Sequence, residues 1–184
     1  MITIVDYDCG NLGSIRNMLL RLGHDALITS DPSKIEEAEK IILPGVGSFD
    51  YGISKLRELG LVDLLSSKKD SKIPILGICL GAQLMCLGSE EGKLTGLGWI
   101  DASVIRFPAR LDDKKFLVPH IGWDLVFPLK ASRLLSDLQQ NPRFYFVHSY
   151  YIKCNVEQDR LISNSYSAPF DSAFERDNIL GVQF

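Results

Sequence analysis

The sequence contains little cysteine and little histidine, and its positive and negative charges nearly cancel. Its 184 residues include four cysteines and three histidines, and the formal net charge is −3. The cysteines are widely separated, with no C-x-x-C pair and no histidine at metal-binding spacing, so we expect free thiols, a reducing cytoplasm, and neither a metal nor a cofactor. So small a charge gives no reason to expect nucleic acid or an anionic membrane as a partner.

Long apolar runs are also missing. No stretch approaches the roughly 20 residues that a membrane-spanning helix needs, and residues 1–7 lack the basic and apolar regions of a signal peptide. We find no internal repeat, low-complexity tract or linker. Hydrophobic residues make up 46% of the chain and charged residues 23%, as in ordinary globular proteins. A chain of this length supports one core, so we expect a single domain over residues 1–184.

The first half alternates short apolar runs with helical patterns. Helices are expected from Asn11 or Ser14 to Leu22, after Asp31, and over residues 49–66 with a break at Gly60. Such an alternation of strands and helices predicts an α/β fold with a mostly parallel sheet and helices on both faces. The expected strands are residues 2–6, 26–29, 40–43 and 75–78.

The second half is rich in strand patterns. One helix is expected near residues 131–139, and a final hairpin is expected to turn at Arg176-Asp177-Asn178. We therefore predict antiparallel strands added to the edge of the parallel sheet. The segments with strand patterns are residues 99–107, 123–127, 144–153 and 161–166.

The most informative segment is Gly77-Ile78-Cys79-Leu80-Gly81. An apolar run ends at Cys79, which has a glycine two residues away on each side, and a helical pattern begins at Leu80. This arrangement predicts a nucleophile elbow, a sharp turn from strand to helix where Cβ atoms beside the exposed side chain would not fit. Unpaired N–H groups at the start of a helix favour a thiolate and lower the pKa of the thiol. We therefore predict that Cys79 is a nucleophile rather than a buried structural cysteine.

A thiolate nucleophile needs a base, and the chain offers only His24, His120 and His148. His24 follows the first expected helix, which places it at the opposite end of the sheet from Cys79. His148 lies in an expected strand and His120 in a loop-like segment, and residue types alone leave each of them as a base or as a structural histidine. Residues 6–10, residues 44–47 and Cys79 follow separate strands, so they should converge where parallel sheets bind ligands.

Several motifs occur in order along essentially the whole chain. The nucleophile motif is Gly77-Ile78-Cys79-Leu80-Gly81-Ala82-Gln83. The other motifs are Asp6-Tyr7, Gly10-Asn11-Leu12, and residues 43–47, 119–123, 146–151 and 181–184. Together they resemble the class I glutamine amidotransferases, and in particular the family of glutaminase subunits of imidazole glycerol phosphate synthase.

The resemblance implies that the protein hydrolyses L-glutamine to glutamate and ammonia. It also implies a heterodimer in which the ammonia passes to a (β/α)8-barrel cyclase for histidine biosynthesis. Cys79 is expected to attack the side-chain amide of glutamine and form a thioester. The backbone N–H of Leu80 and one from Val46 or Gly47 are expected to form the oxyanion hole. The residues implied for substrate binding are Gln83, Glu91, Ser149 and Tyr150, and those implied for the partner interface are Asn11, His120 and Trp123.

The resemblance departs from the family at residue 184. In the family, the Gly-Val-Gln-Phe run continues into His-Pro-Glu, which supplies the base and its orienting carboxylate, whereas this sequence stops at Phe184. His120 and His148 match other family positions, so neither is assigned as the base. We expect residues 1–184 alone to hydrolyse glutamine poorly, because losing a triad member costs several powers of ten in rate. We favour a sequence cut before the motif over a natural loss of it.

Smaller departures leave the partner open. Asp8, Cys9, Leu117 and Asp124 differ from the residues usual in the family, and several of them lie on the segments expected to face the synthase. One alternative is therefore a paralogous glutaminase that serves a sugar amidotransferase in surface-polysaccharide assembly. Another is a non-catalytic subunit that keeps the fold and the partner surface. A cysteine peptidase is less favoured, because Gln83 and the Pro-Gly-Val-Gly loop indicate an amide-binding pocket.

Overall fold

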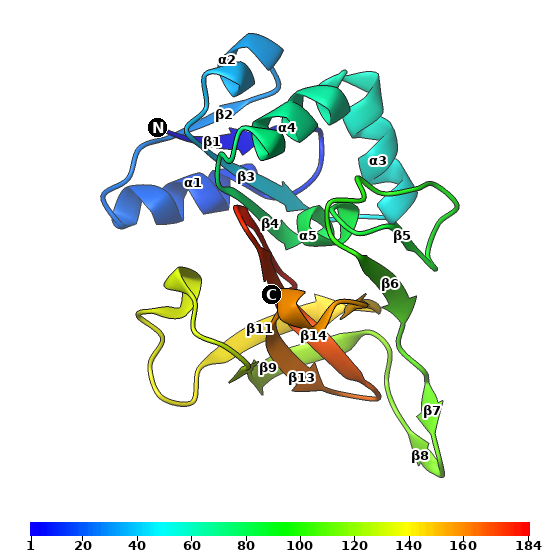
Figure 1. Cartoon of the computed structure of the whole chain (residues 1–184). Coiled ribbons are helices and arrows are strands. Elements are labelled where there is room, and N and C mark those ends of the chain that lie inside the picture. The colour runs from blue at the N-terminus through cyan, green and yellow to red at the C-terminus, as the bar shows by residue number, and fades with distance from the viewer.

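One sheet runs through the whole molecule and joins two differently organised halves (Figure 1). The computed structural model describes all 184 residues. In the first half, strands and helices alternate as predicted. The elements are β1 Ile2–Val5, α1 Leu12–Arg21, β2 Ala26–Thr29, α2 Pro32–Glu36, β3 Lys40–Gly45, α3 Phe49–Glu58, α4 Leu61–Asp70, β4 Ile75–Cys79 and α5 Leu80–Leu84.

Strands β1 to β4 form the parallel part of the sheet. β1 lies between β2 and β3, and β3 pairs with β4, all in parallel. Helix α1 packs against one face, where Ile15 and Leu19 meet Ile4 and Ile42. Helices α2, α3 and α4 cover the other face, where their buried side chains join those of β3. The predicted α/β architecture with helices on both faces is confirmed.

Antiparallel pairs dominate the second half. β6 pairs with β12, β12 with β14, and β13 with β14, whereas β9 and β11 form a separate two-stranded ribbon. The elements are β5 Gly88–Ser89, β6 Ala102–Arg106, β7 Arg110–Leu111, β8 Lys114–Lys115, β9 His120–Leu125, β10 Phe127–Pro128, β11 Arg143–His148, β12 Tyr150–Cys154, β13 Arg160–Ser165, β14 Pro169–Arg176 and β15 Ile179–Val182, with short 3₁₀ turns at Arg133–Leu135 and Glu157–Asp159.

Strand β15 connects the two halves. It pairs in parallel with β4 and in antiparallel with β14, so residues late in the chain lie in the middle of the sheet. The predicted hairpin is confirmed, and Asp177 at its turn has a φ of 55°. At Gly181, a Cβ atom would lie 2.2 Å from the ring of Phe174, so the close approach of β14 requires glycine.

Local signals start and stop the helices. The Asn11 side chain accepts the N–H of Ser14 at the start of α1, and the Asp31 side chain accepts the N–H of Ser33 at the start of α2. Gly23 follows α1 with a φ of +80°, a conformation that glycine adopts without strain.

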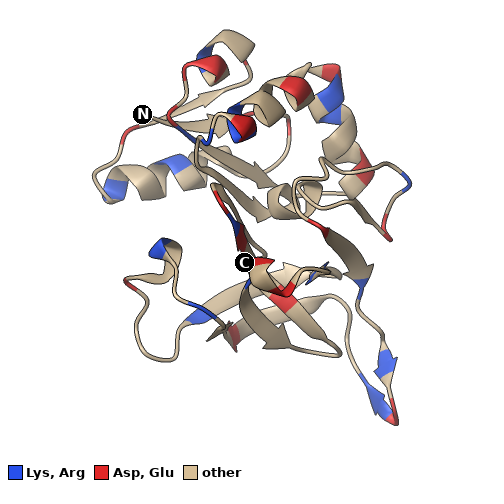
Figure 2. Ribbon diagram, in the orientation of Figure 1, with Lys and Arg blue, Asp and Glu red and all other residues tan.

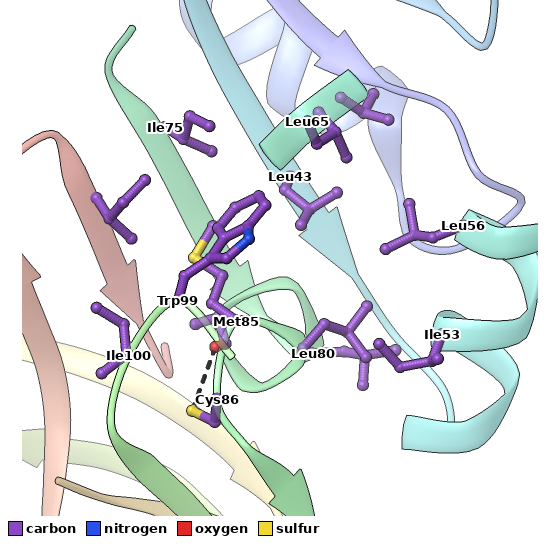
Figure 3. Packing of buried hydrophobic residues seen from close by; sticks show 14 of the residues in the cluster. Leu43, Ile53, Leu56, Leu65, Ile75, Leu80, Met85, Cys86, Trp99 and Ile100 are labelled. Atoms are coloured by element: carbon purple, nitrogen blue, oxygen red, sulfur yellow. Dashed lines mark hydrogen bonds between the residues drawn. The ribbon is translucent and has the colours of Figure 1, made fainter. Parts of the chain in front are cut away.

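The main core lies between the parallel strands and helices α2 to α5. Figure 3 shows its centre, where Trp99 and Ile100 from the loop after β5 meet Leu43, Ile75 and other buried side chains. Two of the four cysteines, Cys9 and Cys86, belong to this core, and Cys154 contributes to it from β12. None of the four is in a disulfide.

The helix expected near residues 131–139 is absent. Only a single 3₁₀ turn forms there, at Arg133–Leu135. A short helix in water depends on burying an apolar face. Leu134 is exposed, and only Leu135 packs against the smaller buried cluster around Phe146 and Phe170 in the second half of the fold. Ser132 accepts the N–H of Leu134, which satisfies the turn without a longer helix.

Charged residues are distributed over both halves of the molecule (Figure 2). Blue and red ribbon segments both occur on α3 and α4, and they occur together on the protruding β7–β8 hairpin. No helix is both long enough and apolar enough to cross a membrane.

Candidate active site

Cys79 lies at the junction of β4 and α5 in a strained backbone conformation. Its φ is 53° and its ψ is −114°, a region that residues with a Cβ rarely occupy. Two glycines make the turn possible. A Cβ at Gly81 would lie 1.8 Å from the carbonyl oxygen of Leu43, and a Cβ at Gly77 would lie 2.7 Å from the backbone of Ala82. The predicted sharp turn from strand to helix is confirmed, whereas the role of Cys79 as the nucleophile stays a prediction.

The loop after β3 is held directly against this elbow. A Cβ at Gly45 would lie 2.4 Å from the hydroxyl oxygen of Tyr7 and 2.9 Å from Cβ of Leu80. The buried Tyr7 hydroxyl donates to the carbonyl of Pro44, and burial raises the pKa of the phenol. The backbone around Gly10 also lies close to Gly45. Residues 6–10, 44–47 and the elbow therefore meet at one end of the sheet, as the sequence predicts.

A cleft of about 280 Å³ opens beside Cys79. All eight residues expected to act in catalysis, in the oxyanion hole or in substrate binding line it. Their individual roles remain predictions, but the structure brings the whole set together. The lining residues are Val46, Gly47, Cys79, Leu80, Gln83, Glu91, Ser149 and Tyr150, joined by Pro119, Val147 and His148.

The acidity of the Cys79 thiol differs from the prediction. Burial raises its pKa above the ordinary value for cysteine, and hydrogen bonds from the Leu80 N–H and the Gln183 amide only partly offset this effect. Helix α5 has five residues, all of which are buried, so desolvation outweighs the stabilisation expected from the helix end.

Glu90 and Glu91 are neighbours in the sequence, but only Glu91 lines the cleft. One carboxylate oxygen of Glu91 accepts the N–H of Phe49 at 2.8 Å, so it caps the start of α3 while lining the cleft. Glu90 instead accepts the N–H of Arg106 at 2.8 Å. Glu91 thus lines the cleft with its position fixed by α3, and its contact with a substrate ammonium group stays a prediction.

Gln83 forms hydrogen bonds with other cleft residues. Its side-chain nitrogen donates to the carbonyl oxygen of Tyr150 at 3.1 Å and to the side-chain oxygen of Gln183 at 2.9 Å. The amide nitrogen of Gln183 in turn lies 3.6 Å from the sulfur of Cys79. Sequence reasoning missed Gln183, although a polar residue continuing the buried apolar β15 strand was an available signal.

The three histidines occupy different environments. His24 lines a surface hollow with Met1 and Ile2, at the opposite end of the strands from the cleft, as expected. Nδ1 of His148 lies 2.8 Å from the carbonyl oxygen of Tyr150, and because a carbonyl only accepts, Nδ1 is the donor. Nε2 of His148 is buried without a partner, and burial lowers its pKa to about 4. No histidine forms a hydrogen bond with the Cys79 sulfur.

The residues expected at the partner interface are not all on the surface. Asn11 is exposed at the start of α1, and Trp123 is 64% exposed on β9. His120, in contrast, is only 4% exposed, and its ring stacks between Phe146 and Tyr166. Its segment is a strand rather than a loop, so side chains alternate, and the side chain of His120 points inward. The expectation that this side chain faces a partner is therefore wrong.

Comparison with known proteins places the chain in a family. Residues 3–184 match the family described as "Glutamine amidotransferase class-I". A protein of Methanococcus maripaludis, named "Imidazole glycerol phosphate synthase subunit HisH 2", is 50% identical over the whole of this chain and 90% of its own length. A protein of Pseudomonas aeruginosa with the same name is 48% identical, with the same coverage.

Solved structures share the fold at low sequence identity. A crystal structure described as a glutamine amidotransferase has a TM-score of 0.74 and 17% identity, over all of this chain and 89% of that one. The glutaminase domain of Trypanosoma brucei CTPS with bound acivicin has a TM-score of 0.64 and 15% identity, over all of this chain and 84% of that one. The chain belongs to the class-I glutamine amidotransferase family, among relatives named imidazole glycerol phosphate synthase subunit HisH.

Proposed function

We propose that this chain is the glutaminase subunit of an imidazole glycerol phosphate synthase. It hydrolyses L-glutamine to L-glutamate and ammonia, and the ammonia is used in histidine biosynthesis. The observation that carries this proposal is the strained Cys79 elbow, which opens into a cleft lined by the residues that the family resemblance assigns to the reaction. Relatives 48–50% identical over the whole chain bear the same name.

The proposed reaction begins at the sulfur of Cys79. The thiolate attacks the side-chain amide carbon of glutamine, and the carbonyl π electrons move to oxygen. Backbone N–H groups of Leu80 and of the Val46–Gly47 loop stabilise the resulting oxyanion. The C–N bond then breaks and the nitrogen leaves with an added proton as ammonia, which gives a γ-glutamyl thioester. Water attacks the thioester, releases glutamate and returns the proton to sulfur.

The base of this reaction is assigned by resemblance alone. It belongs to a His-Pro-Glu motif that follows the Gly-Val-Gln-Phe run in the family. Neither His120 nor His148 forms a hydrogen bond with Cys79, and we assign neither of them a proton transfer. The rate of ammonia release by residues 1–184 alone should therefore be several powers of ten lower than that of the same chain extended by His-Pro-Glu. Equal rates for the two proteins would contradict this assignment.

The hydrogen bonds of Gln83 support the substrate-binding roles. Both N–H groups of the Gln83 amide are used within the protein, so only its oxygen remains to meet a ligand. This oxygen and the carboxylate of Glu91 give the cleft acceptors that suit the α-ammonium group of glutamine. Ser149 and Tyr150 lie on the β11–β12 side of the cleft, and we assign them the α-carboxylate.

We further propose a (β/α)8-barrel cyclase as the partner, in the cytoplasm. Asn11 and Trp123 lie on the exposed surface, and β9 carries a second exposed apolar side chain, Ile121, beside Trp123. The ring of Trp123 packs edge-on against Tyr145 of β11, so the ribbon presents an apolar surface. A sugar amidotransferase remains the second candidate partner, because Asp8, Cys9 and the other departures lie on segments expected to face the synthase.

Labelling with a glutamine analogue tests the glutaminase function. A diazo-ketone analogue of glutamine should alkylate Cys79 in the full-length protein with its partner, and excess glutamine should protect it. The Cys79→Ala variant is the control for labelling of other cysteines. No labelling under these conditions would contradict the enzymatic function and favour a non-catalytic subunit.

Co-purification distinguishes the two candidate partners. Stable association with a (β/α)8 cyclase, together with glutamine-dependent turnover, is the expected result. Stimulation only by a sugar amidotransferase would instead identify the chain as the paralogue. In both cases the Trp123→Glu variant should bind more weakly than the unmodified chain, because a charge would be introduced into an apolar contact.

A further inference from the structure

We infer that Gln183 is a positioning residue, which holds an N–H donor on the sulfur of Cys79 through a chain of hydrogen bonds with a fixed direction. The chain runs from the carbonyl of Tyr150 through the amides of Gln83 and Gln183 to the sulfur. The catalytic consequence rests on the proposed glutaminase function, whereas the effect on the sulfur itself does not.

The direction of these hydrogen bonds follows from the first group in the series, the backbone carbonyl of Tyr150. A backbone carbonyl can only accept, so the group of Gln83 that faces Tyr150, at 3.1 Å, is its NH₂. The second N–H of that NH₂ points to Gln183, at 2.9 Å, so Gln183 must present its oxygen there. The NH₂ of Gln183 is then left facing Cys79, at 3.6 Å. A flipped amide at Gln183 would place two donors together at Gln83 and an oxygen against the sulfur.

The surrounding structure leaves Gln183 little freedom to move. The residue is 1% exposed, and its backbone N–H donates to the carbonyl of Ser172 on β14 at 2.8 Å. The next residue, Phe184, stacks on Phe144 with ring centroids 3.9 Å apart. The amide is therefore fixed by backbone and neighbours before any ligand enters the cleft.

A fixed donor at this position opposes the effect of burial on the thiol. Burial raises the pKa of Cys79, and the side chain of Gln183 and the backbone of Leu80 supply the hydrogen bonds that lower it. Of these two, only Gln183 can be removed by substitution. A donor at the sulfur also restricts the thiolate to one position, which favours attack along a single line.

The carbonyl of Tyr150 connects a further cleft residue to the chain. It also accepts Nδ1–H of His148 at 2.8 Å, so one backbone oxygen orients both Gln83 and His148. Tyr150 itself is the first residue of β12, which pairs with β6 in the sheet. The orientation of the sulfur donor is thus anchored in the second half of the fold, although Cys79 belongs to the first.

The pH dependence of Cys79 alkylation tests this inference without reference to glutamine. Iodoacetamide reacts with the thiolate, and mass spectrometry identifies the modified cysteine. In Gln183→Leu, loss of a hydrogen bond to a charged group should raise the apparent pKa of Cys79 by about one unit, and slow alkylation about tenfold below that pKa. Gln83→Met should give a smaller shift in the same direction, because the side-chain oxygen of Gln183 then loses the donor that sets the direction of its amide. The exposed Gln140→Leu is the matched control and should change nothing.

The double variant and the single variants together test whether Gln83 and Gln183 act through one donor. A double variant of Gln83 and Gln183 should alkylate as slowly as Gln183→Leu alone, because both residues act through the same donor. Unchanged alkylation profiles in both single variants would overturn the inference, even if the protein hydrolyses glutamine. Shifted profiles would uphold the inference even if the full-length protein with its partner neither binds nor hydrolyses glutamine, a result that would refute only the proposed function. If Gln183→Leu does not fold, as judged by circular dichroism, the Gln83→Met profile decides.

Discussion

Backbone strain at Cys79 makes a prediction about stability that is independent of catalysis. With a φ of 53° and a ψ of −114°, Cys79 occupies a conformation that costs a residue with a Cβ about 1–3 kcal/mol. Cys79→Ala removes the sulfur but keeps the Cβ and hence the strain. Cys79→Gly removes both. The difference in stability between the two variants therefore isolates the strain from the contacts of the sulfur.

The expected difference follows from three contributions. Relief of strain favours glycine by about 2 kcal/mol. The greater freedom of glycine in the unfolded chain opposes this by about 0.4–1 kcal/mol, and the loss of a half-buried Cβ opposes it by less than about 0.8 kcal/mol. Cys79→Gly should therefore be more stable than Cys79→Ala by about 0.2–1.6 kcal/mol, or by up to about 6 °C in Tm for a chain of this size.

Urea unfolding followed by circular dichroism, under reducing conditions, measures the difference. The same pair of substitutions at Ser67, an exposed position in α4, is the control. There Ser67→Gly should be less stable than Ser67→Ala by about 1 kcal/mol, because glycine disfavours a helix interior. If Cys79→Gly is destabilised relative to Cys79→Ala as strongly as the Ser67 pair, the elbow stores no strain and the reasoning is refuted.

Three further predictions follow from the fold, the cleft and the surface. Gly81→Ala should destabilise the protein by more than about 4 kcal/mol, because its Cβ would lie 1.8 Å from the oxygen of Leu43. The control is Gly13→Ala in α1, where the added Cβ has space. In the same unfolding assay it should be neutral or stabilising by up to about 1 kcal/mol. Because the pKa of His148 is lowered in the folded protein, the unfolded chain takes up a proton first as the pH falls. The contribution of neutral His148 to the free energy of unfolding is therefore full above pH 6.5. It is lost between about pH 6.5 and 4, by up to about 3 kcal/mol. A His148→Phe variant should lose this part of the pH dependence, and identical slopes of unfolding free energy against pH would contradict the assignment. Trp123→Glu should leave the free energy of unfolding within about 0.5 kcal/mol of that of the unmodified chain. It should weaken partner binding, as measured by calorimetry. Unchanged affinity would remove Trp123 from the interface.

The parallel half of the fold could be predicted from sequence because each of its elements carries a local signal. Asn11 and Asp31 mark helix starts, and the strands are continuous apolar runs, which only a sheet covered on both faces requires. The elbow at Cys79 was also predictable, since its two glycines record close contacts that the structure contains. The sequence signals of these features lie within a few residues of one another, although one contact of the elbow, between Gly81 and Leu43, is long-range.

The errors concern burial, which depends on residues far apart in the chain. His120 was expected at the surface, but β11 and Tyr166 enclose it. The pKa of Cys79 was expected to fall, but its cleft is assembled from segments far apart in the chain, and desolvation there raises it. The helix near residues 131–139 failed for the same kind of reason, because nothing in the fold covers Leu134. Gln183 was overlooked because its partners lie about 100 residues away, at Gln83 and Cys79.

The central position of β15 has a consequence for how the protein folds. Until residues 179–182 emerge from the ribosome, one edge of β4 has no partner, and the strand that leads to Cys79 is an open template for pairing with other chains. Because the contacts that close this edge join residues about 100 positions apart, they form late and slowly. The nascent chain is therefore most prone to aggregation just before its synthesis supplies β15, which makes it a candidate client for chaperones that shield exposed strand edges.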